Sequence, residues 1–474
     1  MSGRFGPAAR FVYAGYELDP AGGRLVVRYE LDGQRFAERF TIPAGSAAWS
    51  SPAAAEAARL LGLLAGVSYY KAGAPPVVDL GDTPTRPGDN ALLGAFYRDG
   101  LGEMAYRNGL DLTGLQIVGG RQLDDDPIPW SGGSSGRPLV PFGGGIDSIV
   151  TVEELRSRHP QTSLFVVSRE GDRFAAIEGA AAVTGLPVVR AERSLDPAIL
   201  APRPGWLNGH VPVTGILSAV AVLAAVLGGH DAVVMANEWS ASAGNLTLPD
   251  GRVVNHQWSK SEAFEELFAV QLGRCLAPPP AYSSYLRSWS ELRVARRFAE
   301  LGAYHRVFRS CNRAFALDPT RRLEHWCGRC DKCCFIDLVL APFLPATTLA
   351  AVFDGHEPLV DPGAEPAFSA LLGLSGDRKP WECVGEVGEC RAAAALAAAR
   401  PDRSGTALLQ ALVSRLPART AAEADRLLQP LGAGAGTAAG AAAGGPPGGV
   451  PSASRGGSAA PPDADDDAAR PVVG

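Results

Sequence analysis

Residues 138–148 read PLVPFGGGIDS, an apolar run followed by three glycines and then two polar residues. The apolar run predicts a buried strand, and the glycines after it let the backbone come close to phosphate oxygens. The next residues open a helix whose free N–H groups and dipole favour an anion. The expected contacts are Gly143, Gly144 and Gly145 with phosphate, Asp147 with Mg²⁺, and Ser148 with phosphate. An ordinary strand-to-helix turn capped by Asp147 is the alternative.

Short aliphatic segments recur after this turn, at residues 164–168, 187–190 and 232–236, with helix-length stretches between them. This alternation predicts an α/β fold in which a parallel sheet carries helices on both faces. Phosphate sites in such folds lie at the carboxyl ends of strands, where a turn opens into a helix. The glycine turn occupies that position. No Gly-Lys-Ser/Thr follows the glycines, so the turn is not the P-loop of kinases and GTPases.

The part of the chain before this sheet has a different pattern. Residues 10–17, 24–30 and 36–42 alternate apolar and polar side chains, which predicts an antiparallel meander, and 53–64 and 90–108 have helical spacing. A segment rich in Gly, Ser and Asp at 123–136 predicts a linker. We therefore expect an N-terminal α+β domain over 1–136, a nucleotide-binding α/β domain over 137–310, a cysteine-bearing helical region over 311–431 and a disordered Ala/Gly/Pro tail over 432–474.

Length and composition agree with a multidomain globular protein. The chain has 474 residues, of which 46% are hydrophobic and 20% charged, and its formal net charge is -6. An acidic chain has no general attraction for nucleic acid, so no nucleic-acid partner is expected. The longest aliphatic stretch, 215–229, is too short to span a bilayer, and residues 1–10 do not resemble a signal peptide. We expect a cytoplasmic protein without a membrane partner.

Four of the eight cysteines have metal-site spacing. Cys327, Cys330 and Cys333 place three thiols on one tight turn, and Cys311 supplies a fourth from upstream. Four thiolates satisfy tetrahedral Zn²⁺ without an open position, which is typical of a structural site. An iron–sulfur cluster on three of these thiols is the alternative. The remaining cysteines are predicted to pack in the core; they are Cys275, Cys334, Cys383 and Cys390.

Polar residues gather after the segment 232–236, where they are expected to line a pocket. Glu238 follows that segment directly, His256 lies in Asn255–Lys260, and His210 precedes an apolar helix. The structural alternatives are a packed histidine, a helix cap and, for Lys260, a surface side chain. A substrate with a diphosphate would also need arginines, and those available are Arg287, Arg293, Arg296, Arg297, Arg306, Arg309 and Arg313.

The glycine turn resembles the S-G-G-x-D-S loop of the ATP pyrophosphatase (PP-loop) superfamily, which includes the NAD, GMP and asparagine synthetases and cyano-deazaguanine synthase. The resemblance implies that ATP is cleaved to AMP and pyrophosphate with Mg²⁺, activating a carboxylate or carbonyl oxygen as an adenylate. Gly143 stands where that superfamily has its first Ser, which removes one hydroxyl donor to pyrophosphate. The cysteine grouping is similar to the zinc knuckle of cyano-deazaguanine synthase, in which S-C is followed by C-G-x-C-x-x-C.

Over residues 10–391 the chain resembles one family, the ATP-dependent UDP-N-acetylmuramoyl-L-alanyl-L-glutamate epimerases. The strings that carry this resemblance are GGGIDS at 143–148, WCGRCDKCCF at 326–335 and KPWEC at 379–383. It implies that UDP-MurNAc-L-Ala-L-Glu is converted to its D-glutamyl epimer for peptidoglycan synthesis, downstream of a muramoyl-L-alanine:L-glutamate ligase. Glu238, His256 and His210 are then the candidate acids and bases.

Two other functions stay open at this point. One is a different adenylating enzyme of the PP-loop superfamily, such as a ligase similar to cyano-deazaguanine synthase or a tRNA thiolase. The other is a zinc-stabilised nucleotide-binding protein without turnover. The net acidity argues against tRNA, and the intact Asp147-Ser148 pair argues against an inactive loop.

Overall fold

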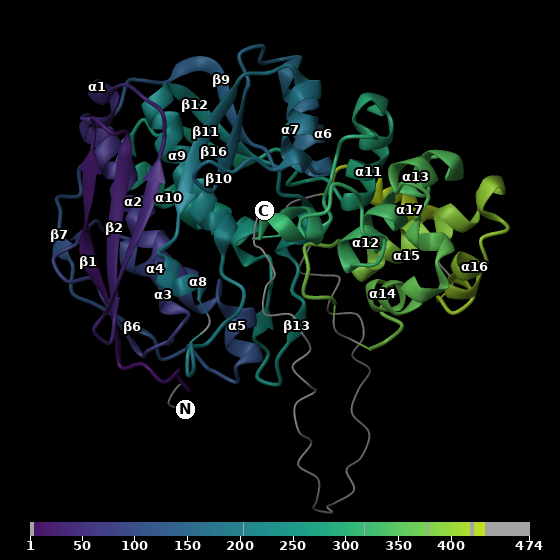
Figure 1. Cartoon of the computed structure of the whole chain (residues 1–474), viewed down its shortest axis with the longest axis horizontal. Coiled ribbons are helices and arrows are strands. Elements are labelled where there is room, and N and C mark those ends of the chain that lie inside the picture. Colours follow the sequence, from purple (N-terminus) through teal and green to yellow (C-terminus); the bar gives the residue numbers. More distant parts are fainter. Residues whose placement is uncertain (1–3, 202, 317, 377–378, 418–420, 432–474) are drawn as a thin grey trace, which may run out of the picture.

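The computed structural model describes residues 4–431 except 202, 317, 377–378 and 418–420. The tail predicted to be disordered, 432–474, lies outside the described residues. A sheet of ten strands forms the centre of the molecule (Figure 1). In spatial order its strands are β16 (Ala281–Ser284), β12 (His230–Met235), β9 (Ser134–Pro141), β10 (Ser163–Ser168), β11 (Val188–Ser194), β3 (Gln34–Thr41), β2 (Arg24–Leu31), β1 (Arg10–Asp19), β4 (Val77–Asp79) and β6 (Gln116–Val118).

The strands from β16 to β11 are parallel to one another, which confirms the predicted parallel sheet. The predicted meander is also present, because β1 pairs with β2 and β2 with β3 in antiparallel fashion. The two parts are joined edge to edge: β3 runs antiparallel to β11, with Phe40 opposite Arg193. Arg193 also forms an ion pair with the buried Glu38 at 2.5 Å. One continuous sheet therefore links the N-terminal meander to the parallel strands.

The segment predicted as a linker contributes to this sheet. β9 begins at Ser134, and the backbone N–H groups of Gly136 and Arg137 donate to the Asp231 carboxylate at 2.8 and 2.9 Å. The polar composition of this segment predicted a loop. The strand was missed because the carboxylate that binds its backbone lies almost a hundred residues away in sequence. The boundary expected at residue 136 falls inside β9, and the division into domains stays a prediction.

Helices cover both faces of the parallel strands. Alternate side chains point to opposite sides, so that Leu139 and Phe165 enter one buried cluster while Val140 and Val166 enter the other. The first face is covered by α2 (Pro52–Ala65), α4 (Asp89–Arg98), α9 (Val213–Gly228) and α10 (Glu262–Cys275). The second face is covered by α6 (Ile146–Arg156), α7 (Ala175–Thr184), α11 (Glu291–Ala299) and α12 (Asp331–Leu340).

Shorter elements complete the described part of the chain. The helix expected over 90–108 is two helices, because the turn at 99–101 separates α4 from α5 (Gly102–Arg107). The other short helices are α1 (Ser46–Trp49), α3 (Val67–Tyr70) and α8 (Pro197–Leu200), and the short strand pairs are β5 (Pro84–Thr85) with β7 (Arg121–Gln122), β8 (Ile128–Pro129) with β15 (Leu276–Ala277), and β13 (Leu246–Thr247) with β14 (Val253–Val254).

The C-terminal region is helical, as predicted, and lies at the right of Figure 1, far from β1–β3. After α12 it comprises α13 (Ala346–Val352), α14 (Glu365–Leu371), α15 (Val387–Ala398), α16 (Ala407–Val413) and α17 (Ala421–Leu427). These helices share the second buried cluster with α6 and α11. None of the helices in the described ranges has the length and apolar character needed to cross a bilayer.

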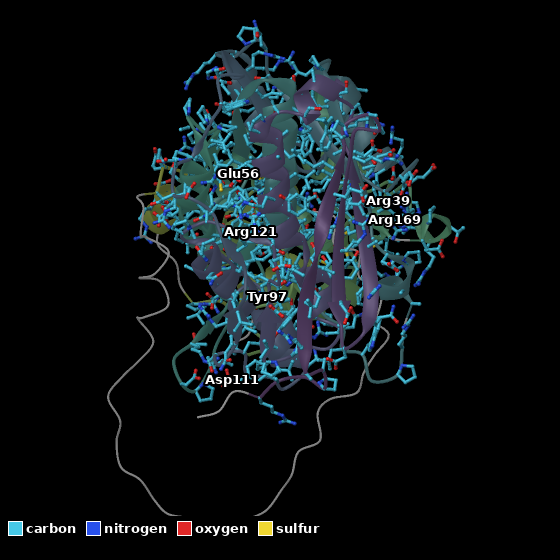
Figure 2. All side chains as sticks on the ribbon, turned by 90° about the vertical axis from the view of Figure 1, so that its left-hand side faces the viewer. Arg39, Glu56, Tyr97, Asp111, Arg121 and Arg169 are labelled. Carbon is cyan, nitrogen blue, oxygen red and sulfur yellow. The ribbon has the colours of Figure 1, made fainter. Side chains whose placement is uncertain are left out.

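A buried cluster of charges lies beside the meander and includes Glu56, which Figure 2 labels. Arg59 of α2 donates to Asp89 at 2.5 Å and to Glu56 at 2.7 Å. Arg86 donates to the same Glu56 at 2.7 Å, and Gln271 donates to the second oxygen of Asp89 at 2.8 Å. All four charged side chains are at most 6% exposed, and each is paired. This network ties α2 to α4 and α10.

Candidate active site

The glycine turn has the backbone geometry that its sequence predicts. β9 ends at Pro141 and α6 begins at Ile146. Gly144 has φ +74°, and a Cβ built there would lie 2.7 Å from the carbonyl oxygen of Ala176. A Cβ at Gly145 would lie 2.9 Å from Ser310 Oγ. Position 144 therefore requires glycine, whereas a side chain at position 145 would require the Ser310 hydroxyl to move. The turn packs tightly against α7 and against the residue before Cys311.

Asp147 is not a helix cap. The N-cap of α6 is Gly145, which has no side-chain cap, and Asp147 lies in the first turn. Its Oδ1 is buried without a hydrogen-bond partner among the described residues. Burial raises the pKa of Asp147, while the ammonium groups of Lys332 and Lys260 oppose that rise. Ser148 Oγ donates to the Gly145 carbonyl at 3.1 Å, which leaves its oxygen able to accept. The unpartnered carboxylate oxygen is suited to a cation.

A polar pocket opens beside Asp147, at the carboxyl ends of β9 and β12. This is the edge of a parallel sheet where such sites are expected. Its lining combines carboxyl, ammonium, amide and thiol groups from distant segments. The lining residues are Asp147, Ala236, Asn237, Glu238, Gln257, Lys260, Glu291, Lys332 and Cys383.

Two buried glutamates lie in this pocket. Glu238 is 4% exposed and accepts a hydrogen bond from the Ala241 backbone N–H at 3.0 Å. Burial and the nearby Asp147 raise its pKa. Glu291 is 3% exposed, its Oε2 has no partner among the described residues, and burial raises its pKa well above the ordinary value. Glu238 was expected from its place after β12, whereas Glu291 was missed, although Ser290 before it caps α11.

The two candidate histidines lie together beside the pocket. The rings of His210 and His256 are 4.1 Å apart, and His256 Nδ1 contacts the Glu103 carboxylate from α5. Burial opposes protonation of His256, but its hydrogen bonds to Cys383 and Glu103 raise its pKa to about 9. Burial and the His256 charge lower the pKa of His210 well below 6.5. His256 is therefore an imidazolium at neutral pH and His210 is a neutral imidazole. No local sequence pattern points to Glu103.

Cys383 was predicted to pack in the core, and this prediction is wrong. The residue is half-buried, lines the pocket, and its Sγ accepts a hydrogen bond from Lys260 Nζ at 3.3 Å. Lys260 is likewise a pocket residue, not a surface side chain. Burial alone would raise the pKa of the Cys383 thiol, but Lys260, His256 and Lys332 lower it well below 9. The thiol reaches the pocket from the segment that precedes α15, and no local sequence pattern reveals that placement.

The other cysteines lie as expected. Cys275, Cys334 and Cys390 are fully buried in the core. The sulfur atoms of the metal-spaced set all lie within 4.8 Å of one another; the set is Cys311, Cys327, Cys330 and Cys333. The Cys330–Cys333 and Cys327–Cys333 sulfur distances are 3.4 and 3.6 Å. A tetrahedral ion with bonds of about 2.3 Å needs sulfur atoms about 3.8 Å apart, so the set could bind a metal ion.

This cysteine cluster adjoins the pocket. Cys330 is the N-cap of α12, and Lys332 lies between two of the thiols while its ammonium group lines the pocket and donates to the Cys383 carbonyl. Gly328 has φ +70°, and a Cβ there would lie 2.8 Å from the His356 carbonyl oxygen. The turn that gathers the thiols therefore also positions one cation of the pocket.

Most of the arginines considered for phosphate binding form ion pairs, hydrogen bonds or ring contacts with other residues of the protein. Arg287 pairs with Glu265 at 2.7 Å and donates to the Glu238 carbonyl at 3.1 Å. Arg297 pairs with Glu154 at 2.6 Å. Arg293 stacks on the Trp289 ring, with its guanidinium carbon 3.9 Å from the ring centroid. These three side chains hold α11 and its preceding loop in place.

Two family models match this chain. The model described as the MurL N-terminal domain matches residues 5–285, and the model described as the MurL C-terminal domain matches residues 307–427. The chain belongs to the MurL family. The N-terminal MurL match runs across residue 136 and contains the whole ten-stranded sheet, while the C-terminal match contains the cysteine cluster and the helices after it.

Three curated relatives have the name UDP-N-acetyl-alpha-D-muramoyl-L-alanyl-L-glutamate epimerase. The protein of Xanthomonas oryzae pv. oryzae is 40% identical over 84% of this chain and 87% of its own length. The Salinispora tropica protein is 39% identical over 86% and 89%, and the Micromonospora protein is 38% identical over 86% and 91%. This MurL chain is therefore an epimerase, an enzyme of the isomerase class, as its sequence predicted.

Proposed function

We propose that this chain inverts the α-carbon of the terminal L-glutamate of UDP-MurNAc-L-Ala-L-Glu, after ATP has activated the glutamate carboxylate as an acyl-adenylate. The assignment of this reaction is supported by relatives that are 38 to 40% identical over most of both chains and are named for the epimerisation. Activation by ATP rests on the glycine turn and on the unpartnered Asp147 oxygen beside it. The products are the D-glutamyl epimer, AMP and pyrophosphate.

The chemistry explains why activation accompanies inversion. The α-hydrogen beside a free carboxylate is scarcely acidic, because its removal builds a second negative charge on the same group. Converting the carboxylate to an acyl-adenylate makes it resemble an ester. A side-chain base can then remove the α-proton, and an acid on the other face can return one. Hydrolysis of the adenylate completes the turnover.

The glycine turn is the proposed ATP phosphate site. Gly143, Gly144 and Gly145 bring backbone N–H groups to the start of α6, where the helix dipole favours an anion. Asp147 would hold Mg²⁺ through its unpartnered Oδ1, and Ser148 would contact phosphate. Bound there, Mg²⁺ would neutralise charge on the phosphate oxygens. Lys260 and Lys332 add two ammonium groups next to the same carboxylate.

The pocket also narrows the choice of proton-transfer groups. Glu238 lines it, and burial raises its pKa, which favours the protonated carboxyl that a general acid needs. His256 reaches the pocket through its hydrogen bond to Cys383 and is held by Glu103. His210 stacks on His256 and stays neutral. We assign Glu238 as one proton-transfer group and the two histidines to its surroundings.

We assign a structural zinc ion to the four-cysteine cluster. The close approach of the four sulfur atoms fits a single tetrahedral ion. An iron–sulfur cubane would place several metal and sulfide atoms between its thiolates and hold them farther apart. Bound zinc would cross-link the turn before α12 to Cys311 and so hold Lys332 in the pocket.

The substrate defines the preceding step in the reaction sequence. A ligase that attaches L-glutamate to UDP-MurNAc-L-Ala must act first, since the epimerase receives the glutamate already joined to alanine. Free L-glutamate lacks the nucleotide-sugar part of the substrate and is expected to be a poor substrate. Binding energy from such remote groups often drives the chemical step.

The test incubates the purified protein with UDP-MurNAc-L-Ala-L-Glu, ATP and Mg²⁺, and then measures glutamate chirality, AMP and pyrophosphate. D-glutamate is expected to appear together with AMP, and neither should form when free L-glutamate replaces the dipeptide substrate. Pyrophosphate release without inversion would indicate an adenylating synthetase. Inversion without ATP would contradict the activation step.

A further inference from the structure

Cys383 is a pocket residue that neither the glycine turn nor the acid assigned above explains. Its Sγ lies 3.3 Å from Lys260 Nζ, within the set of side chains that surrounds Asp147. His256 hydrogen-bonds the same sulfur and is itself held by Glu103. A thiol, an imidazole and a carboxylate in series form the arrangement that activates cysteine in many enzymes.

The cavity around this thiol has polar atoms that a bound ligand could contact. Asp147 Oδ1 and Glu291 Oε2 are buried in its lining without hydrogen-bond partners among the described residues. Buried polar atoms are normally paired, and a bound ligand or ion is one explanation for two unpaired carboxylate oxygens in the same cavity. Glu291 is 3% exposed, so solvent does not supply the missing partner readily. Cys383 therefore faces a space that a bound polar group would occupy.

We propose that the Cys383 thiolate is the catalytic base that removes the α-hydrogen of the activated glutamyl residue, an inference that rests on the proposed function. The Cα–H bond breaks as an S–H bond forms, and its electron pair moves onto the carbonyl oxygen of the acyl-adenylate as an enolate. The Glu238 carboxyl gives its proton to the opposite face of Cα, and the electron pair returns to form the new C–H bond. Exchange with solvent then restores the Cys383 thiolate and the Glu238 acid.

The surrounding charges suit this role. Lys260 and Lys332 are ammonium donors, and the His256 imidazolium is a third cation near the sulfur. They hold the pKa of the Cys383 thiol well below its usual range, which favours the thiolate. A base must be deprotonated before substrate arrives and positioned against the α-carbon. The same cations would stabilise the enolate oxygen.

The test separates proton transfer from adenylation in one reaction mixture. Cys383→Ser and Cys383→Ala are assayed with UDP-MurNAc-L-Ala-L-Glu, ATP and Mg²⁺ in deuterated water. Epimerisation and α-deuterium incorporation are expected to fall by about 10²-fold or more, the contribution of a general base, while substrate-dependent AMP release continues near the wild-type rate. AMP without inversion also shows that the variants are folded.

Cys275→Ser is the matched control. Cys275 is a buried thiol that also faces a cation, since Arg59 Nη2 donates to its sulfur at 3.4 Å, but it lies in the core below α2. This variant should epimerise like the wild type. Inversion by a Cys383 variant near the wild-type rate would overturn the proposal, and so would parallel loss of AMP release and inversion in folded protein. Inversion without AMP in the wild type would instead refute the proposed function.

Discussion

Two groups of buried charged side chains in this molecule differ in whether their polar atoms have hydrogen-bond partners. Beside the meander, Arg59 and Arg86 are paired with Glu56 and Asp89 at 2.5 to 2.7 Å, and Gln271 donates to the remaining Asp89 oxygen. At the carboxyl ends of β9 and β12, Asp147 and Glu291 each keep an oxygen without a partner among the described residues. Both groups are shielded from water, but only in the first does each carboxylate oxygen have a hydrogen-bond partner.

The difference indicates that the paired group stabilises the fold and that the unpaired group serves the reaction. A buried ion pair that satisfies all its atoms holds elements together, and removing one partner leaves an uncompensated charge. A buried carboxylate without a partner destabilises the fold, and such groups persist where a ligand completes them. We therefore expect changes in the paired group to alter stability, and changes in the pocket to alter turnover.

The largest effect is expected at a third buried group, the cysteine cluster, which a metal ion would complete. Cys311→Ala removes one of the four thiols proposed to bind that ion, whose sulfur atoms lie within 4.8 Å of one another. Structural zinc contributes about 10 kcal/mol to the folding of small zinc domains, so metal content and folded yield should both fall sharply. Metal analysis of the soluble fraction checks this. Soluble, metal-replete protein that has lost only epimerisation would place Cys311 in the chemistry instead.

Asp147→Asn is expected to have the next largest effect, on turnover. The amide keeps the size of the side chain but loses the charge proposed to hold Mg²⁺, so AMP formation should fall by about 10³-fold or more. Stability should stay the same or rise, because burial disfavours the charged carboxylate. Rapid-quench assays of AMP and urea unfolding measure the two quantities. Unchanged AMP formation would remove Asp147 from the metal site.

Arg59→Met should show the opposite behaviour. It leaves Asp89 buried without its cation, while Glu56 keeps only Arg86. This costs about 3 to 5 kcal/mol of unfolding free energy, and activity per folded molecule is retained. The matched control is Arg35→Met, because Arg35 pairs with Glu30 at 3.5 Å with its side chain 86% exposed. That exposed pair should contribute at most about 1 kcal/mol. Equal effects of the two substitutions on urea unfolding would refute the structural role.

A smaller, pH-dependent effect is expected at Glu389, which accepts the backbone N–H groups of Glu291 and Glu386 behind the pocket. Burial and the nearby Glu238 raise its pKa from 4.5 to about 8. Between these values the folded protein binds a proton that the unfolded chain releases, so stability falls as the pH rises from about 5 to 8. Glu389→Gln should make that slope shallower in urea unfolding. An unchanged slope would contradict the raised pKa.

The sequence predicted the features that depend on local pattern. The parallel strands, the meander and the glycine turn follow from residue periodicity, and Glu238 follows from its place after β12. The pairing of β3 with β11 was missed because it joins residues that lie far apart in the sequence, and neither strand's own pattern indicates its partner. Cys383 and Glu103 were missed for a similar reason. They come from segments almost 300 residues apart that meet at His256 only in the folded chain.

The proposed function requires the pocket beside Asp147 to couple ATP cleavage to removal of an α-proton. The most direct measurement follows deuterium incorporation at the glutamate α-carbon of UDP-MurNAc-L-Ala-L-Glu in deuterated water, with ATP and Mg²⁺ present and with ATP omitted. We expect deuterium to enter together with D-glutamate and AMP when ATP is present, and not to enter when ATP is omitted. Deuterium incorporation at the same rate without ATP would contradict the account.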